Sequence, residues 1–157
     1  MGFSIDIVAT AKENANFRTV VSTGPNAQVV LMSIPPGGEI GVETHAHVDQ
    51  VLVFVEGSGT ATLDGDARPV RPDTLVHIPA GTRHNVVNDG PTDLRLYTIY
   101  APPQHAHGTI HRTKAEADRI LQIRNEKFPP TMKCAGSIFK NLLLAELPAG
   151  VQMQVPD

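Results

Sequence analysis

Turn-forming residues divide the middle of this chain into short runs that suit β-strands. The chain has 13 Gly and 13 Pro, many of them in pairs between apolar or β-branched stretches. The stretches that predict strands lie at 17–21, 27–34, 51–55, 60–63, 75–78, 83–87 and 94–100. Asp64-Gly65 is a dipeptide typical of tight hairpins. Repeated short strands with turns between them are typical of a sandwich or barrel, so we predict an all-β centre.

Composition limits the class of protein. A length of 157 residues allows one domain with a small appendage. The net charge is −3 and no basic stretch stands out, which argues against a nucleic-acid partner. The single cysteine, Cys134, excludes an internal disulfide framework and fits a reducing compartment. Residues 1–13 lack a signal-peptide core and no run has transmembrane length, so we expect a soluble, cytoplasmic protein without a membrane partner.

Two polar clusters have the residue types of a metal site. The first runs from Gly37 to Gly57 and the second from Pro79 to Asn88. Alternation along a strand places side chains i and i+2 on one face. The predicted ligands are two imidazoles, one carboxylate and one amide oxygen, from Glu43, His45, Gln50 and His84. This set suits one divalent transition metal, Mn, Fe, Ni, Zn or Co, with open positions for water or substrate.

The spacing of these clusters closely resembles the paired motifs of the cupin superfamily, small β-barrels that hold one metal ion. The usual first motif is Gly, five residues, His-x-His, three or four residues, Glu, six residues, Gly. Here Glu43 stands where the first His usually stands, and Gln50 replaces the Glu. The second motif usually begins with Gly six positions before its Pro, and this chain has Asp73 there. The resemblance covers about residues 17–112. It implies a cupin-type antiparallel β-barrel or jelly roll over 1–112, with an N-terminal arm at 1–16, and a homodimer.

A second register for the first motif stays open, in which His45-Ala46-His47 supplies the histidine pair. Only the register with Glu43 and His45 satisfies both flanking glycine spacings and the distance to Gln50. His47 is then a polar residue at the barrel mouth. A barrel that has lost its metal is a further alternative, because an amide is a weaker ligand than a carboxylate.

The character of the chain changes after Pro102-Pro103. Three histidines between residues 105 and 111 are interpreted as part of a polar connector rather than a second metal site, since no carboxylate or cysteine stands at a chelating spacing. Thr113 and Glu116 form a capping box, which predicts a helix over 113–128.

Residues 129–157 are predicted to be an appended tail and not a separate domain. The Pro129-Pro130 pair breaks the helix. The segment 135–141 (Ala-Gly-Ser-Ile-Phe-Lys-Asn) resembles a fragment of UDP-N-acetylmuramate dehydrogenase, and Ser137 matches the position of that family's catalytic serine. No flavin-binding domain accompanies it, so we expect no bound flavin and no reductase activity.

Two classes of function follow from these features. One is a metal-dependent enzyme of dioxygenase, isomerase or lyase type that acts on a small polar metabolite. The other is a barrel that binds or senses a small molecule without turnover, with or without a metal. The sequence does not identify catalytic residues. The candidates for acid–base chemistry are His47, His77 and Tyr97.

Overall fold

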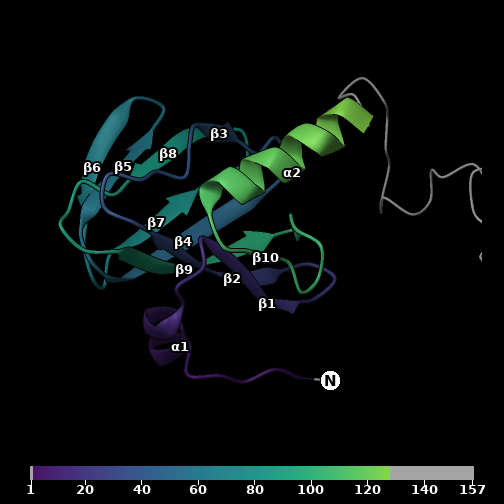
Figure 1. Cartoon of the computed structure of the whole chain (residues 1–157), viewed down its shortest axis with the longest axis horizontal. Helices are drawn as coiled ribbons and strands as arrows, with labels where there is room; N and C mark the ends of the chain where they lie inside the picture. The colour runs from purple at the N-terminus through teal and green to yellow at the C-terminus, as the bar shows by residue number, and fades with distance from the viewer. Residues whose placement is uncertain (1, 128–157) are drawn as a thin grey trace, which may run out of the picture. The chain divides into compact units, whose positions relative to one another are not determined.

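The computed structural model describes residues 2–127, and these build two antiparallel sheets (Figure 1). The larger sheet has six strands, in the order β10 (Ile110–His111), β1 (Arg18–Thr23), β2 (Gln28–Ile34), β9 (Leu94–Ala101), β4 (Asp49–Glu56) and β7 (Leu75–Ile78). The smaller sheet has four strands, in the order β3 (Glu43–Thr44), β8 (Arg83–Val87), β5 (Gly59–Leu63) and β6 (Asp66–Val70). The predicted antiparallel all-β fold is therefore confirmed.

The main core lies between the two sheets. On β9, alternation buries Leu94, Leu96, Thr98 and Tyr100 on the inner face. Leu52 and Phe54 of β4 join them from the same sheet. The smaller sheet contributes Ala61, Val70 and Val86. Burial of these apolar side chains on facing sheets stabilises the closed arrangement.

The N-terminal segment, which the sequence predicts to be an arm at 1–16, contains a helix. Residues Ile7–Glu13 form a short helix, α1, whose first turn is capped because the Ala9 N–H donates to Asp6 Oδ1 at 3.0 Å. Ala11 is fully buried against Leu31 and Val55 on the outer face of the larger sheet. Figure 1 shows α1 and the smaller sheet on opposite sides of the larger sheet. A helix of this length is stable only when it packs on the rest of the protein, so its local sequence does not predict it clearly.

The turns explain how the chain reverses direction. Asp64 and Gly65 have φ values of 48° and 93°, as the predicted hairpin requires between β5 and β6. Asp73 has a φ of 70°, the left-handed conformation that a glycine at this motif position adopts at no steric cost. Strand β6 was not predicted. It contains Pro69, and it forms an edge of the smaller sheet, where proline is tolerated.

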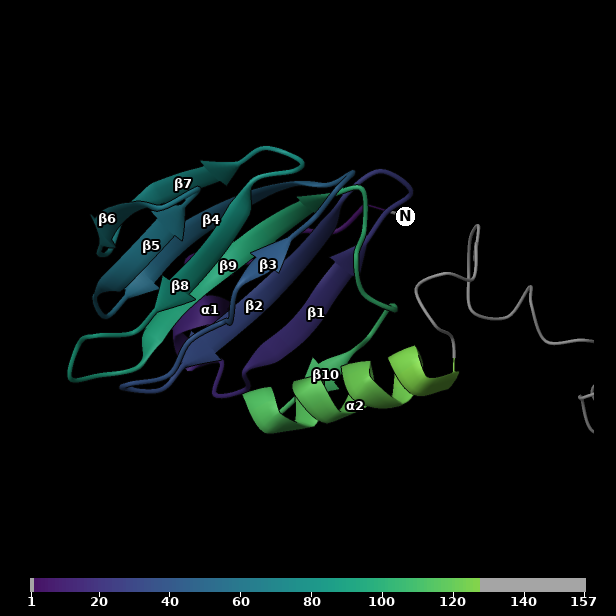
Figure 2. The ribbon, with the colours of Figure 1, turned by 90° about the horizontal axis from the view of Figure 1, so that it is seen from above.

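The predicted capping box begins helix α2 (Lys114–Lys127) (Figure 2). The Glu116 N–H donates to Thr113 Oγ1 at 3.2 Å, and Glu116 Oε2 accepts from the Arg112 N–H at 2.7 Å. The tail at 129–157, including Ser137, and the predicted last helical residue, 128, lie outside the described residues. Within residues 2–127, no helix is long and apolar enough to cross a membrane.

Candidate metal centre

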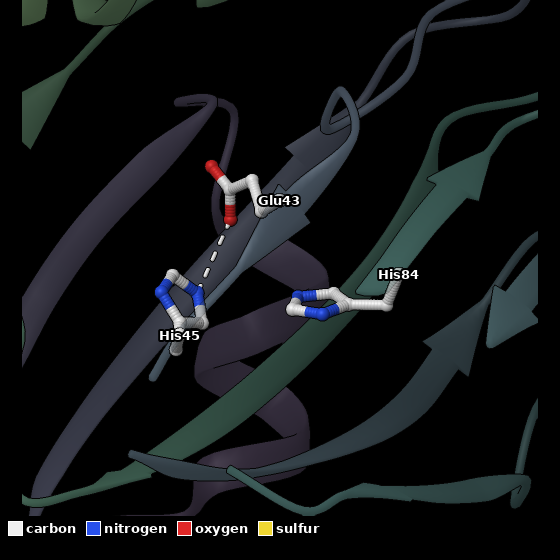
Figure 3. Close-up of side chains that lie close together, drawn as sticks. All are labelled: Glu43, His45 and His84. Atoms are coloured by element: carbon white, nitrogen blue, oxygen red, sulfur yellow. Dashed lines mark ion pairs between the residues drawn. The ribbon is translucent and has the colours of Figure 1, made fainter. Parts of the chain in front are cut away.

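Three of the four predicted ligands converge inside the barrel (Figure 3). Glu43, His45 and His84 each offer a ligand atom, and these atoms lie within 4.8 Å of one another. Glu43 is the antiparallel partner of His84 in the β3–β8 register, and such partners share a face. The His45 carbonyl accepts from the Gly81 N–H at 2.8 Å, so the turn before β8 holds the segment that carries His45. His47, the alternative member of the histidine pair, is not part of this group of three.

His84 is held in the tautomer that a metal ligand needs. Its Nδ1 donates to the Thr82 carbonyl at 2.9 Å, which leaves the lone pair on Nε2. The side chain is buried, and Nε2 has no hydrogen-bond partner among the described residues. A backbone carbonyl on the far nitrogen is the usual support of a histidine that ligates a metal.

Two further buried atoms make no hydrogen bond in the described part of the chain, His45 Nε2 and Gln50 Oε1. His45 Nε2 is 3.3 Å from Glu43 Oε2, an ion pair when the imidazole is protonated. Gln50 is buried on β4, and its Nε2 donates to Thr98 Oγ1 at 3.1 Å, which leaves its oxygen free. Buried polar atoms without partners cost free energy. A divalent ion would satisfy them, so the residues present fit such an ion.

The charge state of Glu43 also suits a ligand. Burial raises the pKa of Glu43, but the close contact of its carboxylate with His45 and the electrostatic influence of His45, Arg18 and His84 outweigh burial and hold the pKa below its usual value. Glu43 is therefore a carboxylate at neutral pH.

Four more polar residues were not among the predicted site residues: Arg18, Tyr100, His105 and His111, the last two of which belong to the segment interpreted from the sequence as a polar connector. The Tyr100 ring centre is 6.0 Å from that of His45 and 5.1 Å from that of His105. Burial raises the pKa of Tyr100, so its phenol stays neutral. Burial, followed by the charge of Arg18, lowers the pKa of His105 to about 3. One sequence feature could have indicated Arg18. It stands two positions before Val20 in a predicted strand, so a strand that buries Val20 also turns the charge of Arg18 inward.

The three candidates for acid–base chemistry lie elsewhere. His47 is exposed and lies outside the cluster of ligand atoms. His77 is exposed on the outer face of β7, where it pairs with Val51. Tyr97 faces outward from β9 and packs beside Ala11 under α1. Strand alternation thus turns His77 and Tyr97 away from the barrel interior.

A short segment of the chain is similar to a flavoenzyme of another family. UDP-N-acetylenolpyruvoylglucosamine reductase of Solibacter usitatus is 63% identical over 49 residues, which are 31% of this chain and 15% of that enzyme. This agrees with the expected resemblance to UDP-N-acetylmuramate dehydrogenase, since the two names denote one enzyme. The similarity covers a small part of the reductase and says nothing of its activity here.

Comparison of the barrel with known proteins points to one family. The cupin domain family model matches residues 30–100. The uncharacterized protein YrkC of Bacillus subtilis is 45% identical over 73% of this chain and 65% of YrkC, so the match leaves a third of YrkC uncovered. Protein L612 of Acanthamoeba polyphaga mimivirus is 35% identical over 69% of this chain and 70% of L612. The crystal structure of BH2720 from Bacillus halodurans has a TM-score of 0.75 at 45% identity, and the match covers 76% of this chain and 95% of that one. With its motif spacing, its two facing sheets and these relatives, the chain belongs to the cupin superfamily.

Proposed function

We propose that this cupin binds one divalent transition metal ion through Glu43, His45 and His84, with Gln50 as a fourth ligand, and binds a small polar metabolite there. The observation that carries the proposal is the convergence of the three ligand atoms within 4.8 Å, two of them on imidazoles with an unpaired buried nitrogen. A bound ion of this class can act as a Lewis acid toward an oxygen of the metabolite or take part in redox chemistry.

The chain's own residues prepare the site for this role. Glu43 supplies the one carboxylate in its ionised form, and Thr82 fixes the orientation of His84. The Tyr100 ring, whose phenol stays neutral, lies beside His45 with 6.0 Å between the ring centres. Buried apolar side chains on both inner faces, such as Leu52 and Val86, exclude water from the surroundings of the site. The ligand then exchanges its contacts with water for contacts with the ion and with fixed side chains.

Binding without turnover is a second candidate, and one observation favours it. His77 and Tyr97 lie on the outer face of the larger sheet, so neither is placed to act as an acid or base on a ligand inside the barrel. An enzyme of dioxygenase, isomerase or lyase type would convert a bound metabolite into a product that mass spectrometry can detect. A sensing barrel would bind the same metabolite and release it unchanged.

Metal analysis of the purified full chain tests the proposal. After reconstitution with Mn, Fe, Co, Ni or Zn, we expect one ion per chain by inductively coupled plasma mass spectrometry. His84→Ala should lose most of the ion, whereas His47→Ala, which changes an exposed histidine of the neighbouring segment, should retain it. Equal loss from both variants would favour the register with His47. Absence of bound ion from the wild type would contradict the proposal.

A further inference from the structure

Arg18 is a buried charge without an anionic partner among the described residues. Its side chain is 8% exposed, and alternation with the core residue Val20 turns it into the barrel. Its Nη1 donates to His111 Nδ1 at 3.5 Å, across the β1–β10 pair. Its Nε is buried and has no partner in residues 2–127, and no salt bridge of the described residues includes it.

The neighbours of Arg18 do not compensate its charge. The Phe17 ring, 5.5 Å from Cζ, provides a weak cation–π contact. Burial lowers the pKa of His111, and the charge of Arg18 lowers it further, so this neighbour accepts a hydrogen bond but brings no negative charge. A guanidinium removed from water without a counter-ion costs free energy unless a ligand provides the missing charge.

Arg18 faces the same interior as the candidate metal centre. It is buried on the inner face of the larger sheet, as are the predicted ligand Gln50 and Tyr100, whose ring centre is 6.0 Å from that of His45. Glu43 is the single carboxylate of the predicted ligand set. With a divalent ion in place, the ion and Arg18 together bring more positive charge than Glu43 can balance. The interior then favours an anion.

We infer that Arg18 binds an anionic oxygen group, a carboxylate or a phosphate, of the same small metabolite that reaches the metal ion with a second oxygen. The inference rests on the proposed function, since it assigns the class of ligand to that site. A guanidinium presents two parallel N–H groups to two oxygens of such an anion, which gives both affinity and orientation. The ligand is then held at two points, and its metal-binding oxygen is directed toward Glu43, His45 and His84.

Calorimetric titration of the full chain, loaded with Mn²⁺ and with its metal content measured first, tests this assignment. Malonate probes a carboxylate, phosphoglycolate probes a phosphate, and malonamide is the neutral comparator. We expect one of the two anions to bind at least tenfold more tightly than malonamide. Arg18→Met should weaken anion binding by about 30-fold or more, equal to about 2 kcal/mol, and leave the metal content unchanged.

Two matched variants complete the design. Arg68→Met removes an exposed arginine of β6 that pairs with Asp66, and should bind the anion as the wild type does. Arg18→Lys keeps the charge without the planar fork, so it should fold, hold metal and bind the anion several-fold more weakly than the wild type. It provides the test if Arg18→Met fails to fold.

The outcomes separate the two proposals. If the wild type holds metal and neither anion binds, or if Arg18→Lys and a folded Arg18→Met bind the anion with wild-type affinity, the inference is wrong and the metal site stands. If the wild type holds no metal, the proposed function fails. If the metal-free chain then binds the anion, and Arg18→Met abolishes that binding, the result would support an anion site without a metal site.

Discussion

At the scale of single residues, two of the three departures of this chain from the usual motifs, Asp73 and Gln50, keep the property that each position needs. Asp73 adopts the positive φ that the usual glycine would adopt, and its backbone N–H donates to the Phe54 carbonyl at 2.9 Å. Gln50 replaces a carboxylate but keeps a buried oxygen directed away from its partner Thr98. Gln50 therefore removes a negative charge and Asp73 adds backbone strain, but both keep the local backbone and side-chain arrangement of the motif.

Gly57 is a residue that the fold requires, and its replacement should be costly. A Cβ at Gly57 would lie 2.4 Å from the Asp93 carbonyl oxygen and 2.9 Å from Leu94 Cα, and its φ is 80°. We expect Gly57→Ala to lower the free energy of unfolding by about 2–5 kcal/mol, from left-handed strain and backbone crowding together. Denaturant unfolding followed by circular dichroism measures this.

Gly65 supplies the control for that change. Its φ is 93°, but nothing lies within 4 Å of an added Cβ. Gly65→Ala should therefore cost only the conformational part, about 1–2 kcal/mol. Equal losses in the two variants would show that crowding at Gly57 is relieved by movement of the Asp93 loop.

His105 should make the metal-free protein sensitive to acid. Burial, and then the charge of Arg18, lowers its pKa from 6.5 to about 3 on folding, so between these values the unfolded chain binds a proton that the folded chain does not. Stability therefore rises with pH through this window and falls as pH drops below about 6.5. The contribution of one such group is at most about 1.4 kcal/mol per pH unit.

The measurement is the free energy of unfolding in the presence of a chelator at several pH values between about 7 and 4. His105→Gln should show a shallower decline of stability toward acid than the wild type. His107→Gln, which changes an exposed histidine of the same connector, should keep the wild-type slope. An unchanged slope in His105→Gln would mean that His105 does not control this pH dependence.

At the scale of elements, α1 depends on one small buried residue. Ala11 is fully buried where α1 meets the outer face of the larger sheet, while Ala9 on the same helix is exposed. Ala11→Glu places an unpaired carboxylate in this contact and should detach α1 from β9 and β4, with a loss of about 2–4 kcal/mol. Hydrogen exchange should show amides of residues 7–13 losing protection.

The matched variant Ala9→Glu should change the free energy of unfolding by less than about 0.5 kcal/mol, as exposed substitutions usually do. Since α1 covers the face away from the metal cluster, both variants should keep their metal content. Loss of metal from Ala11→Glu in a folded barrel would show that α1 supports the site through the sheet.

At the scale of the whole molecule, an apolar surface leads us to predict a homodimer. On the outer face of the larger sheet, Leu75 is 61% exposed and Ile99 36% exposed, and they are cross-strand partners of Val53 and Val51. Contiguous exposed apolar side chains on a sheet often mark an interface. Light scattering at micromolar concentration should give twice the chain mass.

The double variant Leu75→Lys with Ile99→Lys should shift the protein to a monomer and keep its metal. Ile110→Lys, at the opposite edge of the same sheet, adds one charge at an exposed apolar position and should leave the dimer intact. A monomeric wild type would contradict the prediction, and dissociation by Ile110→Lys alone would place the interface at the β10 edge.

The sequence by itself determined the class of fold and the main candidates for the site. Turn dipeptides such as Asp64-Gly65 and the strand runs between them act locally, so they can be interpreted without tertiary structure. Each of the two motifs can also be interpreted from its own residues, Glu43 and His45 in the first and His84 in the second. Strand periodicity alone decides which side chains within a motif share a face. The capping box at Thr113 is local in the same sense, and the helix begins where it predicts.

Only the tertiary structure decided which residues surround that site and which do not. Arg18 and His105 are far from the motifs in sequence, and the fold pairs Arg18 with His111 and places the His105 ring centre 5.1 Å from that of Tyr100. His77 and Tyr97 have suitable chemistry, but the register of β7 and β9 turns them outward. Helix α1 is stabilised because Ala11 packs against Leu31 and Val55 on the outer face of the larger sheet. Contacts between distant segments depend on the register of whole strands, and a shift of one residue would reverse every face.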